Sequence, residues 1–118
     1  MTTQLNVAKV HHVEYQWCGW FAGDNGMENL QSVLNALDVS CYCEESDCLE
    51  IDRAELEDAV KTLKSIDRGE CVNVDIDQLT ECLDNASMTL NECIECFEWL
   101  LNNSDKEHED TWIYVSFF

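Results

Sequence analysis

Residues 49–83 read LEIDRAELEDAVKTLKSIDRGECVNVDIDQLTECL, and a short pattern of apolar and acidic residues occurs twice within them. In each copy an alternating apolar segment reaches an aspartate, Asp52 or Asp75, and an amphipathic run with apolar side chains three and four residues apart follows. The copies begin at Leu49 and Val72, 23 residues apart, and two copies are fewer than a solenoid requires. The stretch therefore predicts two strand-then-helix units, related by local duplication or by coincidence.

The chain is strongly acidic, and its charge is unevenly distributed. Its 118 residues include 25 Asp and Glu against 6 Lys and Arg, a formal net charge of −19. Within residues 1–23, Glu14 balances Lys9, so the later residues carry the whole excess. Such a field repels nucleic acid and anionic membranes and attracts basic protein surfaces over long range. We therefore expect a basic protein partner, no direct nucleic-acid binding and no membrane binding; acidity that only keeps a small protein soluble is the alternative.

Length and composition favour one folded domain over residues 1–118. A chain of this length buries roughly two-thirds of its unfolded surface on folding. Hydrophobic residues make up 46% of the chain, which excludes extended disorder. Eight cysteines occur without an N-terminal secretory signal, and no apolar run reaches the length of a membrane span. These features predict a cytoplasmic protein with reduced thiols.

Hydrophobic periodicity predicts the fold class, an α+β domain with a mostly antiparallel sheet packed against about four amphipathic helices. The most regular apolar stripe falls in the helix that Thr89 would cap, which makes this helix the best core candidate. The last strand is apolar on both faces, so we expect it to be covered and to pair with the N-terminal strand. The expected strands cover residues 5–16, 39–43, 48–51, 71–74 and 111–117, and the expected helices cover residues 27–37, 53–66, 76–86 and 90–102.

Three local details follow from the same patterns. The first strand is expected to be long or bent, with Val7 and Tyr15 on one alternating face. Asp24 or Asn25 would cap the first helix. Ile76 would face the core at the start of the third helix.

No enzyme motif is present. The chain has only four glycines, and none of the phosphate-binding or nucleophile motifs that depend on glycine occurs. The order Trp17-Cys18-Gly19 is similar to a thioredoxin redox turn, but Phe21 stands where the second cysteine would be, and the chain has no proline. His11 and His12 would point to opposite faces of a strand, which prevents them from sharing one ion. We expect no enzymatic activity, no catalytic residues and no cofactor.

A thiolate zinc site is the first alternative. Cys41, Cys43 and Cys48 lie within eight residues, and Cys93 with Cys96 forms a Cys-x-x-Cys pair. This pair falls inside an amphipathic helix, where reduced cysteines usually pack as small hydrophobic residues. The acidic stretches also lack the spacing of a calcium loop. We therefore expect no bound metal and keep a zinc-binding structural protein as an alternative.

The density of negative charge decides whether the protein could imitate DNA. A domain of this mass exposes about 6,600 Å², so its net charge averages roughly one per 350 Å². Duplex DNA has one charge per 1.7 Å of axis, or about one per 100 Å² of a cylinder with a radius of roughly 10 Å. Mimicry therefore requires the carboxylates to gather on about a third of the surface, and the acids crowded between Glu44 and Asp58 favour such gathering.

The composition is similar to that of small acidic inhibitors of restriction enzymes and CRISPR effectors made by phages and mobile elements. We therefore expect a non-enzymatic acidic protein-binding module, most concretely a DNA-mimicking inhibitor of a nucleic-acid-binding protein. A housekeeping interaction module that forms a homo-oligomer, such as a homodimer, through its last strand is a further alternative. The aromatic residues that suit either a core or a protein interface are Trp17, Trp20, Phe21, Trp99 and Trp112. The expected partner-binding residues are Glu44, Glu45, Asp47, Glu50, Asp52, Glu55, Asp58, Asp75, Asp77 and Glu81.

Overall fold

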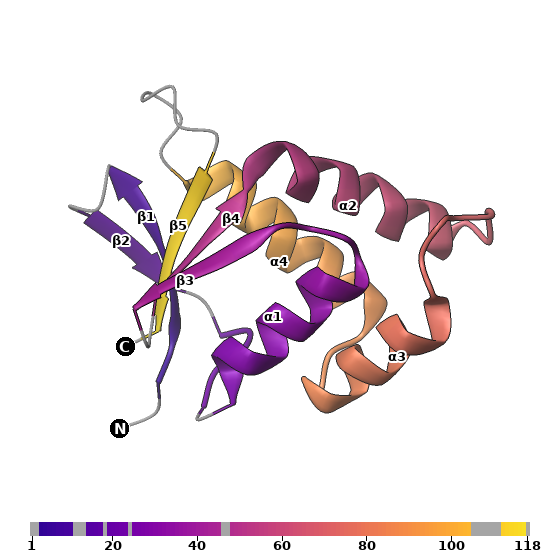
Figure 1. Ribbon diagram of the computed structural model, residues 1–118, viewed down its shortest axis with the longest axis horizontal. Coiled ribbons are helices and arrows are strands. Elements are labelled where there is room, and N and C mark those ends of the chain that lie inside the picture. Colours follow the sequence, from indigo (N-terminus) through magenta and orange to yellow (C-terminus); the bar gives the residue numbers. More distant parts are fainter. Residues whose placement is uncertain are drawn as a thin grey trace.

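The protein is an α+β domain with one sheet and four helices in the part of the chain that the structure describes (Figure 1). The computed structural model describes residues 3–10, 14–17, 19–23, 25–45, 48–104 and 112–117. The predicted fold class is confirmed. In chain order the elements are β1 (Leu5–Val10), β2 (Glu14–Trp17), α1 (Gly26–Ala36), β3 (Cys41–Glu45), β4 (Cys48–Asp52), α2 (Arg53–Asp67), α3 (Ile76–Asn85), α4 (Leu90–Asn103) and β5 (Trp112–Phe117).

The sheet is antiparallel throughout, with the strand order β2-β1-β5-β4-β3. The predicted pairing of the terminal strands is confirmed, because Leu5 of β1 lies opposite Phe117 of β5. Leu49 and Ile51 of β4 are buried while the residues between and beside them are only half-buried. Figure 1 shows the helices on one side of the sheet, so the alternation along β4 separates a core face from an outer face.

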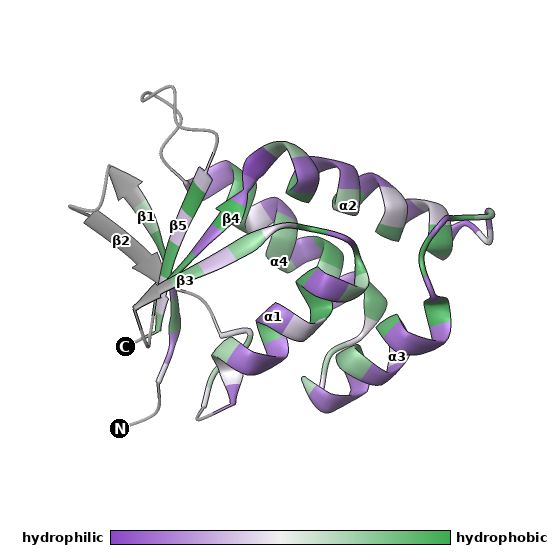
Figure 2. Cartoon of the chain, viewed as in Figure 1, coloured by the Kyte–Doolittle hydropathy of each residue, from purple (hydrophilic) through white to green (hydrophobic). Residues whose placement is uncertain are grey.

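The core lies between the sheet and the helices, and α4 is its centre. Cys93, Phe97 and Leu100 of α4 are fully buried, which confirms this helix as the core candidate. Helix α2 packs against α4, and α3 packs against α1. Figure 2 shows hydrophilic and hydrophobic residues alternating along the helices, as expected of helices with one buried face.

Three helices begin at the residues that the sequence predicts. The side chain of Asp52 accepts a hydrogen bond from the backbone N–H of Glu55 at the start of α2, and Asp75 accepts one from Gln78 at the start of α3. Thr89 forms a reciprocal capping box with Glu92 at the start of α4. These bonds satisfy N–H groups that have no partner within the first helical turn.

The predicted strand over residues 71–74 is wrong. Val72 and Val74 lie half-buried in an irregular connection from α2 to α3, and no described strand pairs with it. Alternating apolar residues form a strand only beside another strand, and the 15 residues of α2 extend the chain roughly 22 Å from the end of β4. The two copies of the sequence pattern therefore share a capped helix but do not share a strand.

Two smaller expectations are also wrong, and a third is tested only in part. Residues 5–16 do not form one strand, because β1 and β2 pair antiparallel and place Tyr15 opposite Ala8, off the face of Val7. Alternation persists through a chain reversal, so periodicity could not reveal it. Asn25 precedes α1 but its side chain makes no capping hydrogen bond, and Asp24, the other predicted cap, lies outside the described residues. Ile76 is 43% exposed, because the first residue of α3 extends past the core that covers the later turns.

Candidate functional site

The structure divides the ten predicted partner-binding residues among separate places. Glu50 and Asp52 lie on β4, whose alternation puts them on the outer face of the sheet. Figure 1 shows α3, the helix after Asp75, at the end of the molecule away from the sheet. Asp47 lies outside the described residues, and only the backbone of Glu44 and Glu45 is described, within β3. The remaining members are Glu55 and Asp58 on α2 and Asp77 and Glu81 on α3.

Some of these carboxylates form hydrogen bonds that build the fold. Besides the caps made by Asp52 and Asp75, the Glu55 carboxylate accepts a hydrogen bond from the backbone N–H of Ser40 at 2.6 Å. This bond ties the first turn of α2 to the residue that precedes β3, and it lowers the pKa of Glu55. The fold therefore sets the positions of these side chains.

Helix α3 presents the clearest acidic stripe. Asp77, Glu81 and Asp84 follow the spacing i, i+4, i+7 and are all exposed, while Leu79 and Leu83 on the other side are buried. Residues 71–104, which include α3 and α4, contain no Lys or Arg. Their acidic residues are Asp75, Asp77, Glu81, Asp84, Glu92, Glu95 and Glu98. The three on α4 were missed, and Asp84 was left out of the expected partner-binding residues, because the densest acidic run in the sequence lies elsewhere, between Glu44 and Asp58.

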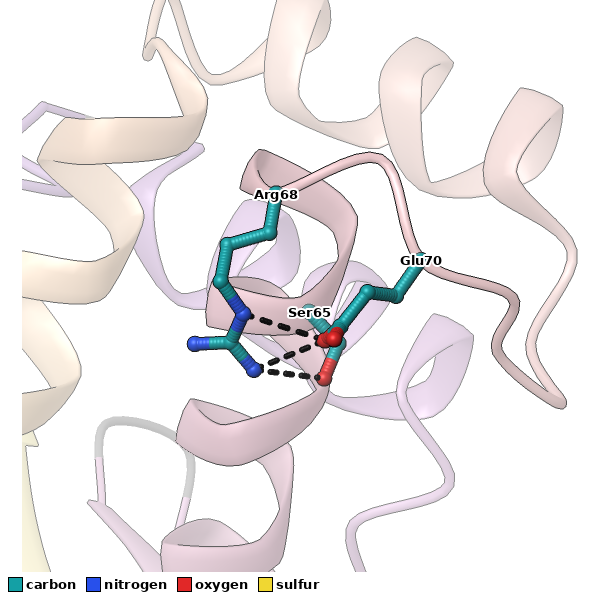
Figure 3. Close-up of polar contacts among 3 residues, drawn as sticks. All are labelled: Ser65, Arg68 and Glu70. Atoms are coloured by element: carbon teal, nitrogen blue, oxygen red, sulfur yellow. Dashed lines mark hydrogen bonds and ion pairs between the residues drawn. The ribbon is translucent and has the colours of Figure 1, made fainter.

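Helix α2 has a mixed charge. Lys64 pairs with Glu98 of α4 at 3.3 Å, and both side chains are exposed. Arg68 donates hydrogen bonds to one oxygen of Glu70 from Nε at 3.0 Å and from Nη2 at 2.8 Å, and Nη2 also donates to the hydroxyl of Ser65 (Figure 3). The Arg68 side chain holds the pKa of Glu70 below its ordinary value. The C-terminal half of α2 therefore does not continue the acidic surface of α3.

The outer face of the sheet carries aromatic rings next to its acids. Tyr42 of β3 lies opposite Glu50, and Glu50 lies opposite Tyr114 of β5. Tyr42 is 58% exposed, and its ring centroid lies 5.1 Å from that of Trp112 at an interplanar angle of 57°. Tyr42 was not among the aromatics singled out from the sequence. The alternating pattern around Tyr42 indicates that it lies on one face of a strand. Only the pairing of β3, β4 and β5, however, brings its ring close to that of Trp112.

Several aromatics singled out from the sequence belong to the core or its margin. Phe21 is buried, and Trp20 and Trp99 are half-buried against the core cluster. Trp17 lies in β2, opposite Asn6.

The cysteines do not converge on a metal site within the described residues. Cys93 and Cys96 are fully buried in α4, and burial raises the pKa of the Cys93 thiol to about 12. Cys43 and Cys71 are exposed, on β3 and after α2 respectively. Among the side chains that are described, no group of three His, Cys, Asp or Glu is arranged to hold an ion. His11, His12 and Cys18 lie outside the described residues.

Comparison with known proteins found no match: neither a protein family, nor a curated protein, nor a solved structure matches this chain. Among the described residues, no helix combines the length and the apolar character that a membrane span requires. The accessible surface is 6,740 Å². Divided by the net charge of −19, this area corresponds to roughly one charge per 350 Å², the average that the sequence predicts.

Proposed function

We propose that this protein is a non-enzymatic binding module that presents the acidic surface of α3 to the cationic groove of a nucleic-acid-binding protein. In its most concrete form it is a DNA-mimicking inhibitor of a host-defence protein, such as a restriction enzyme or CRISPR effector. The observation that carries the proposal is the stripe of Asp77, Glu81 and Asp84 on α3, within a stretch that has no Lys or Arg.

The spacing of charge on α3 supports this proposal. From Asp77 to Asp84 an α-helix rises roughly 10.5 Å, so the three carboxylates of the stripe follow one another about every 5 Å. One strand of duplex DNA carries a phosphate every 3.4 Å of axis. Although the whole surface is about threefold too dilute in charge, the exposed face of α3 approaches the linear density of one DNA strand. A groove that binds one strand through regularly spaced Lys and Arg would meet carboxylates at similar intervals.

We expect the binding free energy to come from exposed ion pairs and the association rate to be raised by long-range electrostatic attraction. Each exposed ion pair contributes roughly 0.2–1 kcal/mol, so α3 by itself gives modest affinity and a fast association rate at low salt. Ionic strength of 0.15 M shortens the Debye length to about 8 Å, and added salt weakens all of these contacts together. Binding through α3 is therefore expected to be salt-sensitive, and its strength is expected to depend on the number of carboxylates retained.

The experiment compares two charge-neutralised variants with the wild-type chain. The first removes the stripe with Asp77→Asn, Glu81→Gln and Asp84→Asn. The matched control removes the same charge from α2 with Glu57→Gln, Asp58→Asn and Asp67→Asn, which are also exposed. Each protein is immobilised, proteins are captured from a bacterial lysate at 50 and 500 mM NaCl, and each captured protein is tested for displacement of its fluorescent duplex DNA.

We expect the wild-type chain to capture DNA-binding proteins at low salt and to displace DNA from at least one of them. The α3 variant should bind that partner roughly tenfold more weakly, which corresponds to about 1.4 kcal/mol, and the α2 variant should change binding far less. Capture of proteins that bind no nucleic acid, capture that resists 500 mM NaCl, or equal losses in both variants would contradict the proposal. A housekeeping module in an acidic shell predicts those outcomes.

A further inference from the structure

Strand β3 is the last strand at one end of the described sheet. In the order β2-β1-β5-β4-β3 the last strand has a neighbour on one side only, and no other described strand pairs with its outer edge (Figure 1). We propose that this edge binds an extended, arginine-bearing segment of a partner protein, which adds beside β3 and places one guanidinium over Tyr42. This inference rests on the proposed function for the cationic nature of the partner, but it assigns recognition to a different surface. Open strand edges bind extended peptides through backbone hydrogen bonds, and neighbouring side-chain sites give specificity.

The ring of Tyr42 is the first element of the site. At 58% exposure it is the most exposed large hydrophobic residue of the described chain, and its contact with Trp112 limits how the ring can turn. A planar guanidinium stacks on such a ring through the attraction between a cation and the electron-rich ring face. The ring therefore favours arginine over a compact ammonium group at this position.

A hollow beside Tyr42 is the second element. It measures about 370 Å³, opens at the turn from α1 into β3, and is lined by Asn35, Asp38, Val39, Ser40, Cys41 and Tyr42. The exposed Asp38 has a φ of 59°, a left-handed conformation that ends α1 and turns the chain toward β3. The negative end of the α1 dipole reaches the same place, and no basic residue occupies the last turn of α1. A cationic side chain beside the edge of β3 would meet both the carboxylate and this dipole.

The charge of the surrounding chain is the third element. Between Lys9 and Arg53 the sequence contains no Lys or Arg, and this span supplies α1, the hollow and all of β3. Asp52, whose carboxylate caps α2, lies opposite Trp112 in the pairing of β4 with β5. The surface that a strand beside β3 would cover is therefore anionic and aromatic, which complements arginine and disfavours acidic or purely apolar segments.

A second copy of this chain fits the edge poorly. Each copy has a net charge of −19, so pairing of β3 with β3 would bring two strongly negative molecules together. Like charges placed opposite each other on neighbouring strands are destabilising. A cationic segment relieves this repulsion, whereas a second copy adds to it.

The test uses two synthetic peptides that differ only in the cation, acetyl-RTRTRTRT-amide and acetyl-KTKTKTKT-amide. Fluorescence anisotropy at 50 mM NaCl gives the dissociation constants for the full chain, and hydrogen–deuterium exchange reports which backbone amides gain protection. We expect the arginine peptide to bind at least about fivefold more tightly than the lysine peptide. We also expect it to protect the amides of β3.

Two variants at Tyr42 and one elsewhere test the assignment. Tyr42→Ala should abolish the preference for arginine, and Tyr42→Phe should keep it because the ring remains. Ile76→Ala removes the other exposed large hydrophobic residue, on α3, and should change nothing. Equal affinities for the two peptides, protection that avoids β3, or a preference that survives Tyr42→Ala would overturn the proposal.

The outcomes separate this proposal from the proposed function. The triple α3 variant should lower the affinity for both peptides by a similar factor while leaving their ratio unchanged. If the protein displaces DNA but does not prefer the arginine peptide over the lysine peptide, the β3 site alone is overturned. If it prefers the arginine peptide but does not displace DNA, only the DNA-mimic function is overturned. Sedimentation that finds a dimer whose formation protects the β3 amides would assign the edge to a second copy, and so would also overturn the arginine site.

Discussion

Gly26 lies where the first residue of α1 comes closest to the preceding loop. A Cβ built at this residue would lie 1.8 Å from the backbone oxygen of Phe21, which is closer than any real contact. Phe21 itself has a φ of 55° and is buried, so the loop has little room to shift. We expect Gly26→Ala to lower the free energy of unfolding by about 1–3 kcal/mol in urea denaturation.

Gly19 provides the matched control for this prediction. It is exposed, and a Cβ at that residue would meet nothing within 4 Å. Gly19→Ala should therefore leave the unfolding midpoint within experimental error of the wild type. If both alanine variants unfold at the wild-type midpoint, the close approach at Gly26 is incorrect.

The Cys93 thiol should lower stability at alkaline pH. Burial raises its pKa from 9.0 to about 12, so the folded state keeps the proton at pH values where the unfolded state loses it. Stability is therefore unaffected below pH 9 and falls as pH rises between 9 and 12, by at most about 1.4 kcal/mol per pH unit from this group. Urea midpoints from pH 8 to 10.5 for the wild type and Cys93→Ala measure the effect, and the slope of the variant should be shallower.

The same burial predicts selective alkylation. Iodoacetamide at pH 8 should label the exposed Cys71 rapidly and leave Cys93 unlabelled until the protein unfolds. Peptide mass spectrometry before and after addition of urea measures both sites. Rapid native-state labelling of Cys93 would place it outside the core.

At the scale of helices and strands, residues close together in the sequence were sufficient to predict where three helices begin. Asp52, Asp75 and Thr89 each precede an amphipathic run, and each caps a helix. The residues involved lie within four positions of one another, so the sequence already contains the whole interaction. The stripe of α4 was predictable for the same reason, because its period belongs to one helix.

Elements that depend on distant partners were less predictable. The alternation of Val72 and Val74 resembles that of a strand, yet no neighbouring strand lies there to pair with it. Tyr42 and Trp112 are separated by most of the domain in sequence and meet only because β4 lies between their strands. Local patterns report propensity, whereas strand pairing and the outer face of a sheet depend on long-range register.

The capping box of α4 gives a prediction at this scale. The hydroxyl of Thr89 accepts a hydrogen bond from the Glu92 backbone N–H at 3.2 Å, and the Glu92 carboxylate accepts one from the Thr89 backbone N–H at 3.1 Å. Thr89→Ala removes the hydroxyl and should cost about 1 kcal/mol in urea unfolding. Thr89→Ser keeps the acceptor and should stay close to wild type. Equal losses in the two variants would show that the methyl group of threonine, not the cap, stabilises α4.

At the scale of the whole molecule, charge sets a limit on stability. The acids outnumber the bases by 25 to 6, and helices α1, α3 and α4 have no basic residue in their last turns. Two ion pairs among the described residues, Lys64 with Glu98 and Arg68 with Glu70, are both exposed and contribute little. The folded state therefore gathers negative charge that an unfolded chain spreads over a larger volume, and this self-repulsion lowers its stability.

Added salt should therefore stabilise the protein. Raising NaCl from 20 to 500 mM shortens the Debye length below the spacing of most surface charges, and a gain of about 1 kcal/mol would raise Tm by roughly 4 °C. Thermal denaturation followed by circular dichroism measures the shift, and the triple α3 variant should show a higher Tm at 20 mM NaCl and a smaller increase. A Tm that falls with salt would mean that attractive pairs outweigh repulsion. A cationic partner should act as salt does, because it binds only the gathered charges of the folded state, and its stabilising effect should fade as NaCl rises.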